Sequence, residues 1–195
     1  QPCDRELMTE IDSVADATLA RVRSQTIGDI PRRTARRVPD KVAIIDGDVT
    51  LTFAQFDALV DRVAAALHAN GLAAGDRVAL LSRNSWQYAV LAFATARAAF
   101  VLVPVNFMLT GEEIAYILGH CRADAFIAAA EFVATAAEAI EVAGTSPIRV
   151  SINQDGSDTD AGWLDFDDWL HNDHPVPQPL IGDDQLLRLM YTSGT

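Results

Sequence analysis

The sequence predicts an α/β fold, in which a mostly parallel β-sheet is flanked by helices and a β-hairpin lies near the start of the chain. Between residues 53 and 152, segments with apolar residues at helical spacing alternate with short apolar runs rich in β-branched residues. This alternation is typical of a parallel sheet with helices packed on its faces. Half of the 195 residues are hydrophobic and 22% are charged, so we expect a soluble, globular chain with a substantial core.

Two helices and a hairpin are expected before residue 53. Apolar residues recur at helical spacing over residues 7–22, which predicts an amphipathic helix. Residues 27–38 predict a second, Arg-rich helix that ends before Pro39. Two β-branched runs then flank Asp46-Gly47-Asp48, and an Asp-Gly turn between such runs predicts a β-hairpin.

Helices and strands alternate in the central part of the chain. Helices are expected at residues 53–70, 86–97, 110–120 and 131–143, and strands at residues 77–81, 100–105, 125–129 and 148–152. The stretch 88–105 is apolar enough to be mistaken for a membrane span. Its composition changes midway from Ala-rich to β-branched, and Arg97 would lie near the bilayer centre, so a buried helix followed by a buried strand is favoured.

The last forty residues are expected to form an acidic loop and one more strand. Residues 154–184 contain nine Asp and no Lys or Arg, which predicts a solvated, mobile loop. Residues 186–191 predict a final strand, which leads directly into Thr192-Ser193-Gly194-Thr195.

Charge and cysteine content restrict the classes of function. The formal net charge of -12 argues against a nucleic-acid partner, which needs a basic surface. Cys3 and Cys121 match no paired metal or redox spacing, and the first residues do not form a secretory signal, so a cytoplasmic protein is expected.

A basic region precedes the hairpin. It contains six arginines: Arg21, Arg23, Arg32, Arg33, Arg36 and Arg37. A basic amphipathic helix can rest on an anionic membrane surface, which would place the protein at the membrane periphery, whereas the alternative is a solvated helix face with local ion pairs. The second interpretation is favoured because the region has no aromatic-rich face that could insert into lipid.

The segment Thr192-Ser193-Gly194-Thr195 is the candidate site. A strand that leads into a small turn with hydroxyl groups and glycine can bind phosphate, because glycine lets backbone N–H groups approach the anion and the hydroxyls add short donors. Taken alone the tetrapeptide is also ordinary turn chemistry, and the sequence has no Walker loop.

Five blocks, in order and spacing, change that assessment. They are LTFAQF (51–56), GLAAGDRVA (71–79), Asn84 leading to VPVN (103–106), LTGEEI (109–114) and MYTSGT (190–195). The set resembles the amino-terminal half of the adenylate-forming (AMP-binding) superfamily, which includes acyl-CoA synthetases, firefly-type luciferases and peptide-synthetase adenylation domains. Among these the chain looks most like a fatty acyl-CoA synthetase.

The resemblance implies a two-step reaction that uses ATP, Mg²⁺ and coenzyme A. A carboxylate attacks the α-phosphate of ATP and releases pyrophosphate, and a thiol then displaces AMP. By the resemblance Thr192, Ser193, Gly194 and Thr195 open the loop that holds the β- and γ-phosphates, where their donors would act electrostatically. Residues 1–26 would form a separate helix, and residues 27–195 a partial amino-terminal domain that is cut inside this loop. Because the loop's continuation and the family's carboxy-terminal lid are missing, this piece is expected to be inactive alone.

Several alternatives stay open on the sequence. The acid could be a fatty acid, an aryl acid or another carboxylate, and the acceptor could be a carrier protein. A non-catalytic nucleotide-binding module is a further alternative, and so is self-association of the chain through an open sheet edge. Arg83, Asn84 and the loop 106–110 follow strand ends near the coenzyme A route of related ligases, but capping and packing are the favoured roles.

Overall fold

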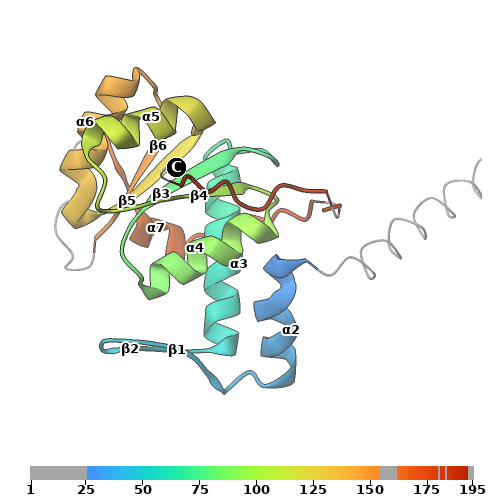
Figure 1. Cartoon of the computed structure of the whole chain (residues 1–195). Helices are drawn as coiled ribbons and strands as arrows, with labels where there is room; N and C mark the ends of the chain where they lie inside the picture. Colours follow the sequence, from blue (N-terminus) through green and yellow to red (C-terminus); the bar gives the residue numbers. More distant parts are fainter. Residues whose placement is uncertain (1–25, 154–161, 180, 183, 193–195) are drawn as a thin grey trace, which may run out of the picture.

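A computed structural model describes residues 26–153, 162–179, 181–182 and 184–192 (Figure 1). Three parts of the sequence-based prediction lie outside the described residues: the expected helix at 7–22, the separate region 1–26 except for Thr26, and positions 193–195. The remaining part of the chain folds around one parallel sheet, as the sequence predicts.

The central sheet has five parallel strands in the order β4-β3-β5-β6-β7. Its strands are β3 (Arg77–Leu81), β4 (Val101–Val105), β5 (Ala125–Ala129), β6 (Ile148–Ile152) and the short β7 (Leu164–Asp165). Four of the five agree with the prediction, and all five residues of β5 are buried, as expected for a strand covered on both faces. Because β3 pairs with β4 on one side and with β5 on the other, the chain reverses its winding direction at β3.

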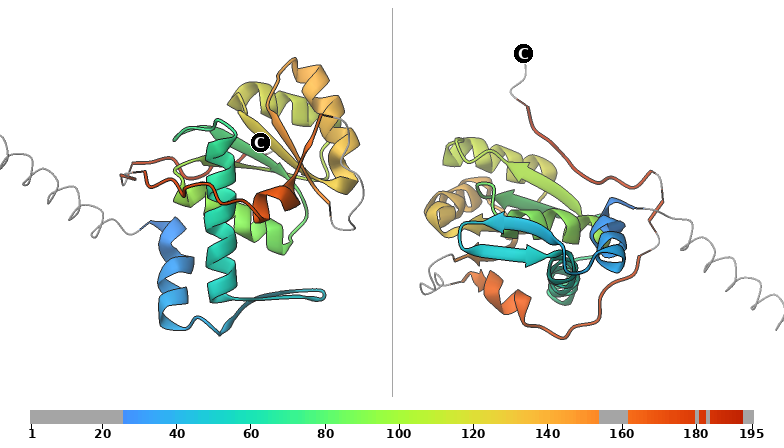
Figure 2. Two further views of the ribbon diagram at one scale, coloured as in Figure 1. Left: turned by 180° about the vertical axis from the view of Figure 1, so that it is seen from behind. Right: turned by 90° about the horizontal axis from the view of Figure 1, so that it is seen from below.

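Helices cover both faces of this sheet (Figures 1 and 2). One face carries α3 (Phe53–Ala69), α4 (Trp86–Arg97) and α7 (Phe166–Leu170), and the other carries α5 (Gly111–Cys121) and α6 (Val133–Ala143). Alternate residues of β3 enter the two cores, since Leu80 packs on the α3 side and Leu81 on the α5 side. We therefore find two separate cores on a single sheet.

The amino-terminal described residues form a short helix and the predicted hairpin. A 3₁₀ turn, Ile27–Asp29, precedes α2 (Ile30–Arg37), so the expected single helix over 27–38 begins as a tighter turn. The hairpin consists of β1 (Val42–Asp46) and β2 (Val49–Thr52), and Gly47 at its tip has a φ of 56°. That left-handed conformation costs glycine least, which explains the Asp-Gly turn.

Arg97 is a buried cation at the centre of the helical layer. Its guanidinium lies 2.6 Å from Asp57 Oδ1 and 2.7 Å from Asp61 Oδ1, and it donates two hydrogen bonds to the carbonyl of Gly28. A Cβ at Gly28 would lie 2.5 Å from the Arg97 backbone, so only glycine fits this close approach. The expectation that 88–105 is a buried helix and strand is confirmed, and no helix in the described ranges is both long and apolar enough to cross a membrane.

The prediction of a solvated loop over residues 154–184 is wrong for its described middle part. Three aromatic side chains, Trp163, Phe166 and Trp169, are buried there, and Phe166 begins α7. Asp165 caps this helix by accepting a hydrogen bond from the backbone N–H of Asp167. This part is folded because Phe166, Trp169 and Leu170 recur at helical spacing and form one buried face of the helix, despite the acidic composition of the segment.

The prediction of a full strand at residues 186–191 is also wrong. This segment, which we call the terminal segment, is extended beside β4 but forms a single parallel bridge, between Leu102 and Arg188. The backbone N–H of Leu102 donates to the Leu187 carbonyl, and the Leu102 carbonyl accepts from the Leu189 N–H. The terminal segment is therefore joined to β4 at one residue rather than along a ladder of hydrogen bonds.

Candidate functional site

The carboxyl ends of β3, β5 and β6 border a cavity of about 630 Å³. Open α/β sheets bind ligands at this edge, where the winding direction changes. The hairpin contributes Asp46 and Asp48 to the lining of the cavity, and Asn153 and Glu131 line it as well. The cavity therefore combines the sheet edge with the hairpin that the sequence predicts.

Four acidic residues, Asp46, Asp48, Glu131 and Asp167, are part of the lining of this cavity. Asp46 accepts a hydrogen bond from the backbone N–H of Trp86 and so caps the start of α4. Burial, and next the charge of Asp165, raise the pKa of the Asp167 carboxyl above its usual range. Gln87 is buried at the same place, and its Oε1 atom has no hydrogen-bond partner among the described residues.

Arg83 connects two of the strand-end positions that the sequence identifies. Its guanidinium lies 4.4 Å from the ring centroid of Phe107 and forms an ion pair of 3.1 Å with Glu131. Phe107 in turn stacks on Phe132, with 6.0 Å between the ring centroids. Sequence reasoning identified Arg83 and the 106–110 loop, but it missed Glu131 and Phe132, whose contacts depend on the tertiary fold.

The loop after β4 also has the structural roles that the sequence favours. Asn106 Oδ1 accepts a hydrogen bond from the backbone N–H of Met108. Thr110 caps α5, because its hydroxyl accepts from the backbone N–H of Glu113 while the Glu113 carboxylate accepts from the Thr110 N–H at 2.8 Å. Thr110 and Asn106 thus shape the loop beside Phe107.

Of the four predicted phosphate-binding residues, only Thr192 is described. It is exposed and directly follows Tyr191 at the end of the terminal segment, whereas Ser193, Gly194 and Thr195 lie outside the described residues. The structure does not place Thr192 in the cavity with Arg83 and Asn84.

Tyr191 is held by a side-chain contact with α5. Its hydroxyl lies 2.7 Å from Nδ1 of His120, and the two rings meet edge to face with 5.6 Å between their centroids. The ring of Tyr116 stacks on the imidazole of His120. Burial, and next the charges of Cys121 and Tyr116, raise the pKa of Tyr191 above its usual range, so the hydroxyl keeps its proton.

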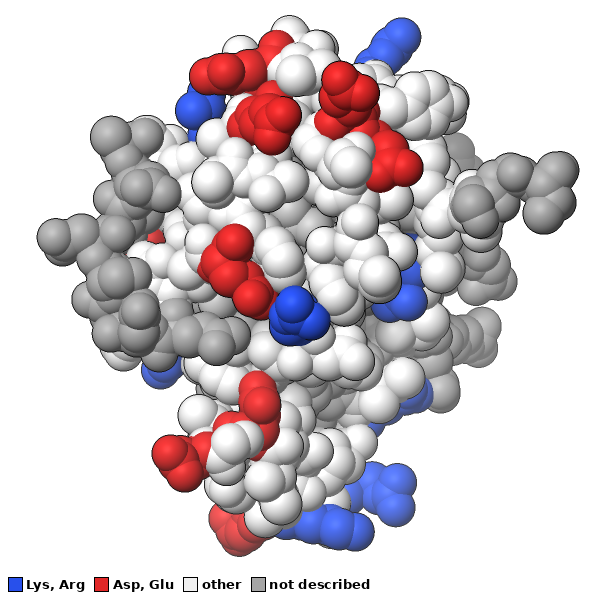
Figure 3. All heavy atoms as spheres, turned by 60° about the vertical axis from the view of Figure 1, so that its left-hand side comes forward, with Lys and Arg blue, Asp and Glu red and all other residues white. Residues whose placement is uncertain are grey.

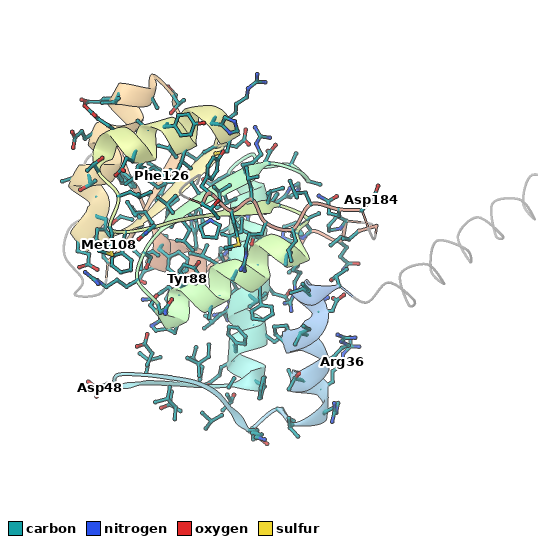
Figure 4. The ribbon with its side chains drawn as sticks, in the orientation of Figure 1. Arg36, Asp48, Tyr88, Met108, Phe126 and Asp184 are labelled. Carbon is teal, nitrogen blue, oxygen red and sulfur yellow. The ribbon has the colours of Figure 1, made fainter. Side chains whose placement is uncertain are left out.

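Basic and acidic side chains are interspersed on the surface. Figure 3 shows acidic side chains in both the upper and the lower part of one face, with Lys and Arg among them. Arg33, Arg36 and Arg37 of α2 are exposed, whereas Arg32 forms an ion pair of 2.7 Å with Asp61. No group of three or more His, Cys, Asp or Glu suited to a metal ion occurs within the described part of the chain. The side chains of these elements are drawn in Figure 4, where Arg36 lies on α2, far from Met108 beyond β4.

Comparison with known proteins gives a consistent set of similarities. The sequence profile of the AMP-binding enzyme family matches residues 31–195. A feruloyl-CoA synthase of Amycolatopsis is 36% identical over 174 residues, which are 89% of this chain and 32% of that protein. The long-chain-fatty-acid–CoA ligase FadD13 of Mycobacterium tuberculosis is 34% identical over 179 residues, which are 88% of this chain and 33% of that protein.

Structural comparison agrees with the sequence. The crystal structure of the N-terminal domain of FACL13 from Mycobacterium tuberculosis superposes with a TM-score of 0.70 at 30% identity, and the match covers 87% of this chain and 42% of that one. The chain spans about a third of the length of the curated relatives that it matches.

Proposed function

This chain belongs to the AMP-binding enzyme family, and from that premise we propose that it is the amino-terminal part of an AMP-forming acid–thiol ligase. The observation that carries the proposal is the family match itself, which covers residues 31–195 and so includes the MYTSGT block at 190–195. Acyl-CoA ligases among the relatives and a matching fold support it.

The proposed reaction has two balanced steps. A carboxylate oxygen attacks the α-phosphorus of ATP, the bond to pyrophosphate breaks, and an acyl-adenylate forms. The thiol of coenzyme A then loses its proton to solvent, its sulfur attacks the acyl carbon, and AMP leaves with the electron pair of the broken C–O bond. In this scheme Thr192, Ser193, Gly194 and Thr195 donate hydrogen bonds to the β- and γ-phosphates as negative charge moves onto pyrophosphate. Mg²⁺ would accompany the phosphates and share that charge.

The acid is proposed to be a fatty acid, with an aryl acid as the alternative. A long-chain-fatty-acid ligase and a feruloyl-CoA synthase are similar to this chain at 34% and 36% identity, so both classes have support. The cavity at the sheet edge does not favour one acid over the other, since both polar and apolar residues line it. We further propose that residues 1–195 alone do not catalyse the reaction, and that the protein acts in the cytoplasm.

Exchange of labelled pyrophosphate into ATP tests the proposal. The full-length protein is incubated with ATP, Mg²⁺ and one acid at a time, from a series of fatty acids of increasing length and a series of aryl acids. Carboxylate-dependent exchange is expected, and its profile identifies the acid. Residues 1–195 under the same conditions are the matched control, in which no exchange is expected.

A non-catalytic nucleotide-binding module is the competing hypothesis. It predicts binding of ATP by the full-length protein, measured by calorimetry, without exchange for any acid. Folded protein that shows this combination would overturn the proposed ligase.

A further inference from the structure

We propose that His120 is a positioning residue for ATP, because its hydrogen bond to Tyr191 fixes the residue next to the phosphate-binding loop. The inference rests on the proposed function, since it concerns the loop that begins at Thr192. It assigns a role to α5, which lies outside the MYTSGT block.

The terminal segment is held by backbone bonds at Leu102, by the contact of Tyr191 with His120, and by packing of Leu189 and Tyr191 on the core. Its backbone is joined to β4 at Leu102, whose N–H donates to the Leu187 carbonyl at 3.2 Å and whose carbonyl accepts from the Leu189 N–H at 2.9 Å. Beyond Leu189, the Tyr191 hydroxyl forms a hydrogen bond with Nδ1 of His120, which is 71 residues away in sequence. Leu189 and Tyr191 both pack against the core on the α5 side, whereas Met190 between them is exposed.

The position and direction of the backbone at Thr192 depend on the hydrogen bond between Tyr191 and His120. Consecutive Cα atoms are about 3.8 Å apart, so a fixed Tyr191 leaves Thr192 little freedom of position. Without the His120 contact, the last described residue joined by a hydrogen bond would be Leu189, three residues before Thr192, and Tyr191 would be held by packing alone. Phosphate donors work best when they are oriented before the ligand arrives, because the ordering cost is then already met in folding.

His120 can sustain this contact with either tautomer. The Tyr191 hydroxyl donates to an unprotonated Nδ1, or it accepts from a protonated one. The ring of Tyr116, stacked on His120 at 5.6 Å between centroids, limits how far the imidazole can turn. The three aromatic side chains therefore form a small exposed clamp, Tyr116–His120–Tyr191, at the end of α5.

The test measures KM values for ATP and for the acid in pyrophosphate exchange by the full-length protein. His120→Ala and Tyr191→Phe each remove one side of the hydrogen bond, and each is expected to raise the KM for ATP about fivefold, which corresponds to about 1 kcal/mol. The KM for the acid should change less than about twofold. The double variant should resemble the single ones, because both substitutions remove the same interaction.

Two further variants separate positioning from general stability. His120→Asn places an amide near the position of Nδ1, and it should recover much of the affinity for ATP. Glu112→Gln, the matched control on the same helix, lies outside this contact and should leave the KM for ATP unchanged. A fall in thermal stability without a change in the KM for ATP would overturn the positioning role.

The outcomes also separate this inference from the function on which it rests. Absence of exchange by the wild-type protein would overturn the proposed function, and the role of His120 in ATP binding with it. Exchange by the wild type, with an unchanged KM for ATP in His120→Ala and Tyr191→Phe, would overturn the inference alone. Additive effects in the double variant would likewise contradict a shared hydrogen bond.

Discussion

Single residues join parts of this fold that lie far apart in the sequence, and Arg97 is the clearest case. Its side chain is only 3% exposed and bonds to Asp57, Asp61 and the Gly28 carbonyl at once. The planar guanidinium has five donors in a fixed arrangement, which suits several acceptors around one point. Arg97 therefore links α4 to α3 and to the 3₁₀ turn before α2.

Removal of Arg97 should destabilise the chain strongly. Arg97→Ala leaves two partly buried carboxylates without their shared cation, and we expect a loss of about 3 kcal/mol, near the lower end for a broken buried pair because Asp61 keeps Arg32. Urea unfolding measures the change. Arg97→Lys should recover only part of it, because one ammonium group cannot make the same fork of bonds.

Arg83→Ala is the matched control for that measurement. It removes an arginine from an ion pair with Glu131 whose side chains are 60% and 52% exposed, so solvent screens the pair. A loss of about 1 kcal/mol is expected, including the contact with Phe107. Equal losses for Arg83→Ala and Arg97→Ala would show that burial does not strengthen the Arg97 contacts.

At the scale of elements, the start of α5 depends on a reciprocal cap between Thr110 and Glu113. The backbone N–H of Thr110, and next its hydroxyl, donate to the Glu113 carboxylate and lower its pKa below the ordinary value of 4.5. A lowered pKa means that the folded state favours the charged form. The resulting stability is present above the unfolded pKa and is lost as pH falls through the folded pKa.

The stability of the Glu113→Gln variant should therefore approach the stability of the wild-type protein as the pH is lowered. The wild type is expected to be the more stable protein at pH 7, and the difference should shrink below pH 4.5, where the unfolded carboxylate is protonated. Thermal unfolding across this pH range gives the comparison. Glu112→Gln removes the same charge one residue earlier, outside the cap, and a pH dependence equal to that of Glu113→Gln would contradict the role of the cap.

The helices and strands also show how much of the fold could be predicted from the sequence. Strands β3, β5 and β6 were predicted at their observed bounds, because a buried parallel strand leaves an apolar run between recognisable helices. Helix α7 was missed because Asp165, Asp167 and Asp168 hide the apolar spacing of Phe166 and Trp169. The terminal segment was predicted as a strand from its apolar run, but strand pairing depends on a neighbour that local sequence does not specify.

The residues of the candidate site differ in how well the sequence alone identifies them. Thr192 was found by a motif, which is a local signal, and its structural role stays a prediction. His120 had no such signal, because its partner Tyr191 is 71 residues away and a histidine on a helix surface is ordinary. Arg83 was found by its place after a strand, but its contact with Phe107 required the loop after β4 to fold back.

At the scale of the whole molecule, β4 lies at one edge of the sheet, and the terminal segment joins it at a single bridge. Leu186 and Met190, on either side of that bridge, are 53% and 67% exposed. A strand at the edge of a sheet beside exposed apolar side chains is a template for pairing with another chain. We therefore expect residues 1–195 to self-associate.

Sedimentation velocity over a series of concentrations tests this expectation, because the average sedimentation coefficient should rise with concentration if copies pair. Met190→Lys adds a charge at the edge and should reduce the rise, since charged side chains protect sheet edges. Ile45→Lys is the matched control: Ile45 is 73% exposed but lies on the hairpin, away from β4, and its substitution should leave association unchanged. A single monomeric species at every concentration would show that the one bridge of the terminal segment is enough to protect the edge.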